Sequence, residues 1–313
     1  MKNKRAFLLI ILAGLLWGSS GIFVNLLSPY GFSPIQLVAT RATVSFVLLG
    51  AFMLIKSRKT FLTEPRRIPL FIALAITLFL SMFLYYSAMV RTSVCTAVIL
   101  LNLHPVYVTA VSAVVFKERL SAIKLSSVFA MLVGCAFVSG VFGGIKLDFA
   151  GLVLGILSGM AYASYVLLVK YYNREGVAST TANIYTFLFM TVITLSVCKP
   201  ISLFATAAGN PMPAFPLLIA LGICTSVIPF ALNGIALRDL SAGTVAALGI
   251  MEPLSATIYS VVFFSEPMDV WKVLGVVIIL SAVAFLGVDE ILAEKRADKL
   301  EKKKPSEELS LAD

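Results

Sequence analysis

Two pairs of neighbouring residues combine a titratable side chain with a proline inside long apolar runs. His104–Pro105 lies within LNLHPVY, residues 101–107, and Glu252–Pro253 lies within GIMEPLS, residues 249–255. A carboxyl group and an imidazole can each take up and release a proton, and histidine does so near physiological pH. Each proline removes a backbone hydrogen bond and bends the helix that contains it. Titratable groups in such surroundings are typical of sites that move protons or bind a polar substrate.

The composition of the chain indicates a protein that lies in a lipid bilayer. Of its 313 residues, 59% are hydrophobic and 13% are charged, whereas a soluble domain is about 45–50% apolar and about 25% charged. The net charge of +9 does not predict a nucleic-acid partner, because the basic residues lie between apolar runs and at the two ends. The four cysteines all fall in apolar runs without the spacing of a disulfide framework, and we interpret them as reduced.

The apolar runs predict an all-α integral membrane protein with ten transmembrane helices. A helix crosses the hydrocarbon core in about 20 residues. The predicted spans are 7–27, 33–55, 69–90, 92–116, 122–142, 149–170, 180–198, 214–237, 241–264 and 269–288. Since short connections separate most of them, the helices are expected to form one compact domain.

Lysine and arginine predict the orientation of these spans. With the N-terminus in the cytoplasm, 20 of the 25 basic residues fall on the cytoplasmic side. The outer side holds four, which are Arg91, Lys146, Lys199 and Lys272. Arg41 is the remaining one and lies inside a span. Both termini are therefore expected in the cytoplasm, with residues 289–313 forming a charged tail.

The two halves of the chain resemble each other in sequence. Residues 88–118 align with 236–266 without a gap, and ten of the 31 positions are identical, including Pro105 with Pro253 and Glu118 with Glu266. AGLLWG at 13–18 also aligns with LGILSG at 154–159. The predicted unit is thus five helices, with a first repeat over 1–142 and a second over 149–288. Because five is odd, the second repeat must be inverted in the membrane, which is typical of secondary transporters.

Three segments resemble the EamA-type ten-helix transporters of the drug/metabolite transporter superfamily. They are LLWGSSGIFVN in the first span, VFKERLS after the fourth, and GIMEPLSATIYSVVFFSEPMDVWKVLGVVIILSAV near the end. The resemblance covers about residues 7–288. It implies a carrier in the bacterial inner membrane, of a kind that often exports amino acids or other metabolites and usually uses a proton gradient.

The titratable groups of the two repeats are expected near the middle of the membrane. His104 lies about 18 Å from the outer surface and Glu252 about 17 Å from the cytoplasmic surface, at about 1.5 Å of helix per residue. Arg41 lies about 12 Å below the outer surface by the same measure, a depth that matches Glu252 and allows an ion pair. Each group also has a simpler interpretation. Glu252 could only brace the bend, His104 could only bond a carbonyl, and Arg41 could extend toward the lipid headgroups.

Other polar and aromatic side chains are candidates for binding substrate. They are Trp17 and Asn25 in the first span, Tyr86 in the third, Tyr162 and Tyr165 in the sixth, and Asn183 and Tyr185 in the seventh. Tyrosines also anchor helices at the membrane surface, and Trp17 could simply fill the core. Gly14, Gly18, Gly155 and Gly159 predict close helix packing, and Glu118 and Glu266 predict helix caps.

The sequence favours a proton-coupled secondary carrier of a small organic metabolite that works by alternating access, with export preferred. It shows no phosphate-binding loop, no HExxH and no nucleophile with a base, so we expect no enzyme, no cofactor and no metal. The expected partners are the substrate, protons and the bilayer, and the protein is expected to be a monomer or homodimer. A receptor or scaffold without transport, or an uptake carrier for nucleobases or sugars, remains the alternative.

Overall fold

The computed structural model is helical in most of the residues that it describes, and nearly all of these helices are α-helices. These residues are 2–56, 63–115, 122–138, 148–174, 179–236, 248–249, 251–285, 288 and 292. The helices of the first half are α1 (Lys2–Gly18), α2 (Ser20–Leu27), α3 (Pro34–Lys56), α4 (Ile68–Arg91), α5 (Val94–Leu101), α6 (His104–Val115) and α7 (Ala122–Val138). Those of the second half are α8 (Phe149–Arg174), α9 (Ser179–Cys198), α10 (Pro200–Gly209), α11 (Pro211–Gly222), α12 (Ile228–Ala236), α14 (Met251–Phe264) and the final helix Val270–Phe285.

Six helical segments of the described chain are long and apolar enough to cross a membrane. They are Arg5–Tyr30, Pro34–Ile55, Pro65–Arg91, Phe149–Val169, Thr181–Cys198 and Pro211–Ala236. They match six of the ten predicted spans, so the protein crosses the membrane several times. The other four predicted spans correspond to shorter helices or run partly outside the described residues. Glu118 and nearly all of the tail 289–313 also lie outside the described residues.

The bend predicted at Pro105 is a complete interruption of the helix. Helix α5 ends at Leu101, two residues turn, and α6 begins at His104. In the second half, α14 begins at Met251, so that Pro253 also lies in the first turn of a helix. Proline is well tolerated there, because the first backbone N–H groups of a helix have no partner within it.

Two further features were not anticipated from the sequence. Residues 200–209 form a short helix, α10, in what was expected to be a loop. Between α11 and α12, residues Ile223–Val227 form one turn of π-helix, flanked by Pro216 and Pro229. Such π-turns leave backbone groups outside the regular hydrogen-bond ladder and occur often at functional sites.

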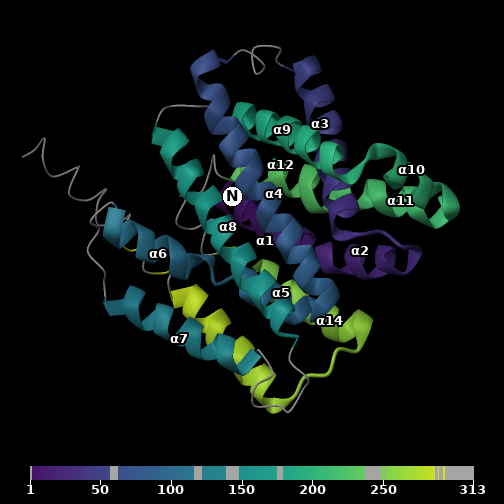
Figure 1. Ribbon diagram of the computed structural model, residues 1–313. Helices are drawn as coiled ribbons and strands as arrows, with labels where there is room; N and C mark the ends of the chain where they lie inside the picture. The colour runs from purple at the N-terminus through teal and green to yellow at the C-terminus, as the bar shows by residue number, and fades with distance from the viewer. Residues whose placement is uncertain are drawn as a thin grey trace, which may run out of the picture.

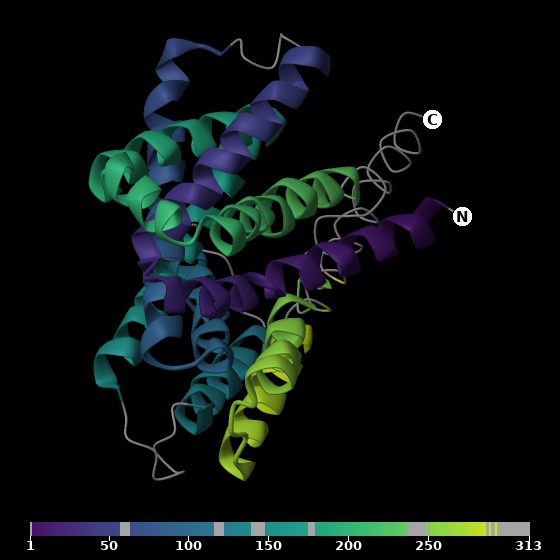
Figure 2. The ribbon, with the colours of Figure 1, turned by 90° about the vertical axis from the view of Figure 1, so that its right-hand side faces the viewer.

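The helices pack in pairs that join the two halves of the chain. Helices α4 and α8 lie side by side through the middle of the molecule, and α3 packs against α9 (Figure 1). Helix α1 packs against α12, with which it runs side by side in Figure 2, and also against α14. Most buried apolar residues belong to one cluster, which includes Val24, Leu37, Tyr86 and Phe187.

Glycines permit the closest of these approaches. A Cβ atom on Gly18 would lie 2.8 Å from the carbonyl oxygen of Glu252 and 2.9 Å from the nitrogen of Ala256. On α8, a Cβ atom on Gly159 would lie 3.0 Å from the carbonyl oxygen of Leu100. Small residues thus let α1 reach the backbone of α14 and let α8 reach that of α5, as the sequence predicts.

Substitution of Gly18 by valine is expected to lower the stability of the protein strongly. The new side chain would meet backbone atoms of α14, which cannot rotate away, and overpacking of this kind costs about 1–3 kcal/mol or more. Gly234→Ala is the matched control, since no atom lies within 4 Å of a Cβ atom there. Thermal unfolding of the purified protein in detergent should separate the two variants. Equal melting temperatures would show that α1 does not pack this closely on α14.

Candidate functional site

Glu252 is the acidic residue at the junction of α1 and α14. It lies in the first turn of α14, where the helix dipole favours a negative charge. Its backbone N–H donates to the carbonyl of Gly249 at 3.1 Å, and its side chain is partly buried. Within the described chain its carboxyl group forms no hydrogen bond and no ion pair. It is therefore free to take a proton or meet a ligand.

Arg41 is a buried cation held by the π-helical turn. Its side chain projects from α3, and the residue is 6% exposed. Nε donates to Oγ of Ser226 at 2.6 Å, Nη2 donates to the carbonyl of Thr225 at 2.6 Å, and Nη1 donates to the hydroxyl of Tyr86 at 3.0 Å. A guanidinium has five N–H groups, so two of them remain unused by described residues.

The predicted ion pair between Arg41 and Glu252 is not formed. No described acid lies within 4 Å of the guanidinium, which binds the hydroxyls of Ser226 and Tyr86 and a carbonyl instead. The two groups nevertheless lie close enough for their charges to interact. Their separation leaves the carboxyl group unpaired and the guanidinium partly unsatisfied.

Two tyrosines complete a group of side chains around Glu252, which we call the central polar cluster: Arg41, Tyr85, Tyr86, Tyr162 and Glu252. Tyr85 on α4 and Tyr162 on α8 both interact electrostatically with Glu252 and Arg41. The Tyr85 hydroxyl is buried without a hydrogen bond, although Ser20 approaches it. Four helices, α3, α4, α8 and α14, thus contribute polar groups to one interior region.

His104 adjoins this cluster through Tyr162. The two rings meet edge to face, with centroids 4.8 Å apart. Nδ1 of His104 is buried, and the nearby carbonyl of Leu101 does not have the geometry of a hydrogen bond. A buried polar atom without a partner costs about 1–3 kcal/mol, and its cause in a native protein is a functional role, local strain, or a bound water or ion. Tyr85 and His104 both provide such an atom.

The other residues singled out from the sequence lie in three different surroundings. Tyr165 stacks on Tyr162 at 5.9 Å, next to the cluster. Trp17 packs edge to face on Phe230 of α12 at 5.7 Å. Asn25 is exposed near the end of α2, where its amide donates to the carbonyl of Gly21.

Tyr185 and Asn183 lie on α9. Tyr185 stacks on Phe71 at 5.0 Å, within a separate apolar group. Asn183 is partly buried two residues earlier on the same helix.

Sequence reasoning did not identify Thr225 and Ser226 as partners of Arg41. Both are buried, and their part in the site depends on the π-turn, which turns a backbone carbonyl and a hydroxyl toward α3. The nearby prolines Pro216 and Pro229 were a visible sign of irregular helix, but they did not specify a π-turn.

Comparisons with known proteins agree with this architecture. The sequence profile of the EamA-like transporter family matches residues 4–140 and again residues 149–288. An uncharacterized transporter of Bacillus subtilis (strain 168), YxxF, is 24% identical over 287 residues, which is 90% of this chain and 89% of that protein. An uncharacterized transporter of Archaeoglobus fulgidus is 26% identical over 274 residues, covering 88% of this chain and 93% of the relative.

A solved crystal structure resembles the fold with a TM-score of 0.62. Its sequence is 18% identical, and the match covers 93% of this chain and 99% of the other. At that identity the likeness concerns the fold alone. The family profile, in contrast, spans nearly the whole sequence in two consecutive matches. This multi-pass membrane protein therefore belongs to the EamA-like transporter family.

Proposed function

We propose that the protein is a proton-coupled carrier of a small organic metabolite, such as an amino acid, and that it works by alternating access. The observation that carries this proposal is the unpaired carboxyl group of Glu252, in the first turn of α14 and within electrostatic reach of buried Arg41. A carboxyl group inside a membrane protein is costly, and the acidic residues found there usually mark ion or substrate pathways.

Arg41 is the proposed anchor for an anionic group of the substrate. A planar guanidinium binds a carboxylate through two parallel N–H groups, and two of its N–H groups have no partner within the described chain. Ser226, Thr225 and Tyr86 fix its orientation in advance, which lowers the ordering cost of binding. The substrate carboxylate would thus lie between Arg41 and the tyrosines, close to the group that takes the proton.

The packing of the helices supports two inverted repeats, an arrangement common in secondary transporters that work by alternating access. In two inverted repeats, α1 would correspond to α8, and α14 would correspond to α5 and α6 together. The contact of α1 with α14 should then be matched by a contact of α8 with α5 and α6, and both contacts are present. Likewise α1 with α12 becomes α8 with α4, and both of these pairs pack as well. Gly18 and Gly159 lie at equivalent places in these contacts.

The protein is proposed to lie in a bacterial inner membrane with both termini in the cytoplasm. The distribution of lysine and arginine supports this orientation. The family resemblance favours export of the substrate. A monomer or homodimer would suffice, since both repeats belong to one chain.

Reconstitution into proteoliposomes tests the proposed function directly. Purified protein should bind members of a panel of amino acids and organic acids, and a bound compound should raise the melting temperature of the protein in detergent. Vesicles that contain the protein should accumulate the same compound when a pH difference is imposed, and a protonophore should abolish the accumulation. If a bound compound crosses the bilayer equally well without any pH difference and is never concentrated, the protein is a facilitator without proton coupling.

A further inference from the structure

The connection between α4 and α5 is held from the other half of the chain by charged side chains. This tip, residues 91–95, lies at the end of the molecule that the charge pattern assigns to the outside. Helix α5 begins at Val94, and its first four backbone N–H groups all have partners. Thr96 and Ala97 bond Ser93, the N-cap residue.

The other two of these four N–H groups donate to a carboxylate more than 170 residues away in the sequence. Val94 N–H donates to Oε1 of Glu266 at 2.8 Å, and Cys95 N–H donates to Oε2 at 3.4 Å. Glu266 follows Ser265, whose backbone is in the left-handed region with φ of 50°. The expectation that Glu266 caps a helix is thus correct, but the capped helix belongs to the first half of the chain.

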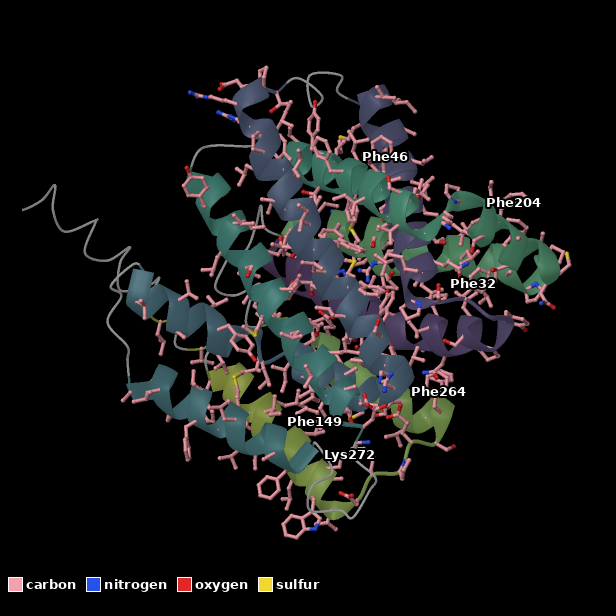
Figure 3. The ribbon with its side chains drawn as sticks, in the orientation of Figure 1. Phe32, Phe46, Phe149, Phe204, Phe264 and Lys272 are labelled. Carbon is pink, nitrogen blue, oxygen red and sulfur yellow. The ribbon has the colours of Figure 1, made fainter. Side chains whose placement is uncertain are left out.

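Lys272 reinforces the same contact. It lies in the final helix and is 7% exposed, and its Nζ donates to Oγ of Ser93 at 3.4 Å. Figure 3 labels Phe149, Phe264 and Lys272, which all lie toward the lower part of the molecule, far from Phe46. We call Ser93, Glu266 and Lys272 the clasp. The hydrogen bonds that Glu266 accepts and the one that Lys272 donates are charge-assisted.

The other neighbours of the tip bind it less specifically. Val94 packs against Gly21 of α2, where a Cβ atom would collide with its side chain. Arg91 forms an exposed ion pair with Asp148 at 3.1 Å, just before α8. The Gly151 N–H, followed by Arg91, holds the pKa of the Asp148 carboxyl below its usual range, so this pair is charged at neutral pH. Exposed pairs nevertheless contribute little.

We propose that the clasp is the outer gate of the carrier: Glu266 and Lys272 hold the tip closed over the path to the central polar cluster and release it when the protein opens outward. The helix break at residues 102–103 is the hinge, because it separates the clasped α5 from α6. A gate needs contacts that are specific in the closed state and replaceable by water in the open state, and a carboxylate on backbone N–H groups meets both needs.

Cys95 provides a built-in reporter for this gate. Its side chain is 0% exposed beside Thr257, so the closed gate protects it from reagents. The test uses a variant that keeps Cys95 and carries alanine at the other three cysteines. A membrane-impermeant maleimide is applied separately to each side of reconstituted vesicles. The gate proposal rests on the proposed transport function. Because the labelling experiment needs no substrate, a negative result for the gate can be told apart from a negative result for transport.

Release of the clasp should accelerate labelling from the Ser93 side only. Glu266→Ala should raise the labelling rate on the order of tenfold or more, because two charge-assisted hydrogen bonds are lost. Glu266→Gln and Lys272→Met should give smaller increases, and they preserve the test if the alanine variant does not fold. Asp148→Asn is the matched control, which breaks the exposed pair yet can still cap α8, and it should change the rate less than about twofold.

A second reporter separates opening from local fraying. Ser20→Cys, in a chain without the native cysteines, lies beside Tyr85 and is 2% exposed. A true gate should expose both reporters when Glu266 is replaced. Labelling of Cys95 alone would mean that only the tip frays, which would overturn the proposal. An unchanged labelling rate at Cys95 in the folded Glu266→Gln and Lys272→Met variants would also overturn it.

Discussion

Glu252→Gln should abolish accumulation of substrate driven by a pH difference while sparing exchange of substrate for substrate. Glutamine keeps the size and polarity of the side chain but cannot carry a proton. A difference of one pH unit is worth about 1.4 kcal/mol per proton, which is about a tenfold concentration ratio. Vesicles with two pH units across the membrane should therefore fall from about a hundredfold accumulation to none if one proton is coupled. Counterflow of labelled substrate measures the exchange that remains.

Glu64→Gln is the matched control for this substitution. Glu64 is an exposed acid, paired with Arg66 and Arg67 before α4, and its loss should leave accumulation unchanged. His104→Gln should shift the pH at which transport is fastest without abolishing it, because His104 contacts the central polar cluster through Tyr162 rather than through Glu252 in the described chain. If the Glu252→Gln protein still concentrates substrate, Glu252 braces the helix start and the coupled proton travels elsewhere.

The sequence predicts this fold well where the signal is periodic and local. Apolar length predicts spans such as Pro34–Ile55 and Thr181–Cys198 within a few residues. Proline marks the starts of α6 and α14, since the rigid ring leaves few positions other than a helix start. The chemical types of Arg41, Tyr86 and Glu252 indicate a polar interior region, because apolar surroundings make such residues costly.

The partners within that region were harder to predict because they depend on packing between distant segments. Depth alone suggested that Arg41 pairs with Glu252. The π-turn instead directs the carbonyl of Thr225 and the hydroxyl of Ser226 toward the guanidinium, and no periodicity reveals a π-turn. Glu266 could be recognised as a capping residue, but only the fold shows that it caps a helix from the other half of the chain.

Substitutions at two adjacent tyrosines should show how much the hydrogen bonds of Arg41 contribute to stability. Tyr86→Phe removes a hydrogen bond to a charged group, which is expected to cost about 1.5–3 kcal/mol. Tyr85→Phe removes a buried hydroxyl that has no hydrogen bond and should leave stability unchanged or slightly higher. Ser226→Ala should resemble Tyr86→Phe. Thermal unfolding in detergent compares these variants, and equal effects at Tyr85 and Tyr86 would contradict the hydrogen bond from Arg41.

Replacement of Arg41 itself should have the largest effect of any substitution in the site. Arg41→Ala leaves Ser226, Tyr86 and the carbonyl of Thr225 without their donor, at a cost of several times about 1–3 kcal/mol. Arg41→Lys keeps the charge but cannot reach three separate acceptors, so folding should be partly retained. Substrate affinity should nevertheless fall on the order of tenfold, because a lysine lacks the planar pair of N–H groups that binds a carboxylate.

A double-mutant cycle then measures the coupling between Arg41 and Glu252. Charges several ångströms apart in a medium with an effective dielectric constant of about 20 interact by about 2 kcal/mol. Arg41→Met removes the cation and with it this coupling. The destabilisation of the Arg41→Met/Glu252→Gln double variant should therefore be smaller than the sum for the two single variants. Arg41→Lys keeps the cation and should preserve most of the coupling. Strictly additive losses with Arg41→Met would mean that the two groups act independently. In that case the substrate anchor and the proton carrier would belong to separate sites.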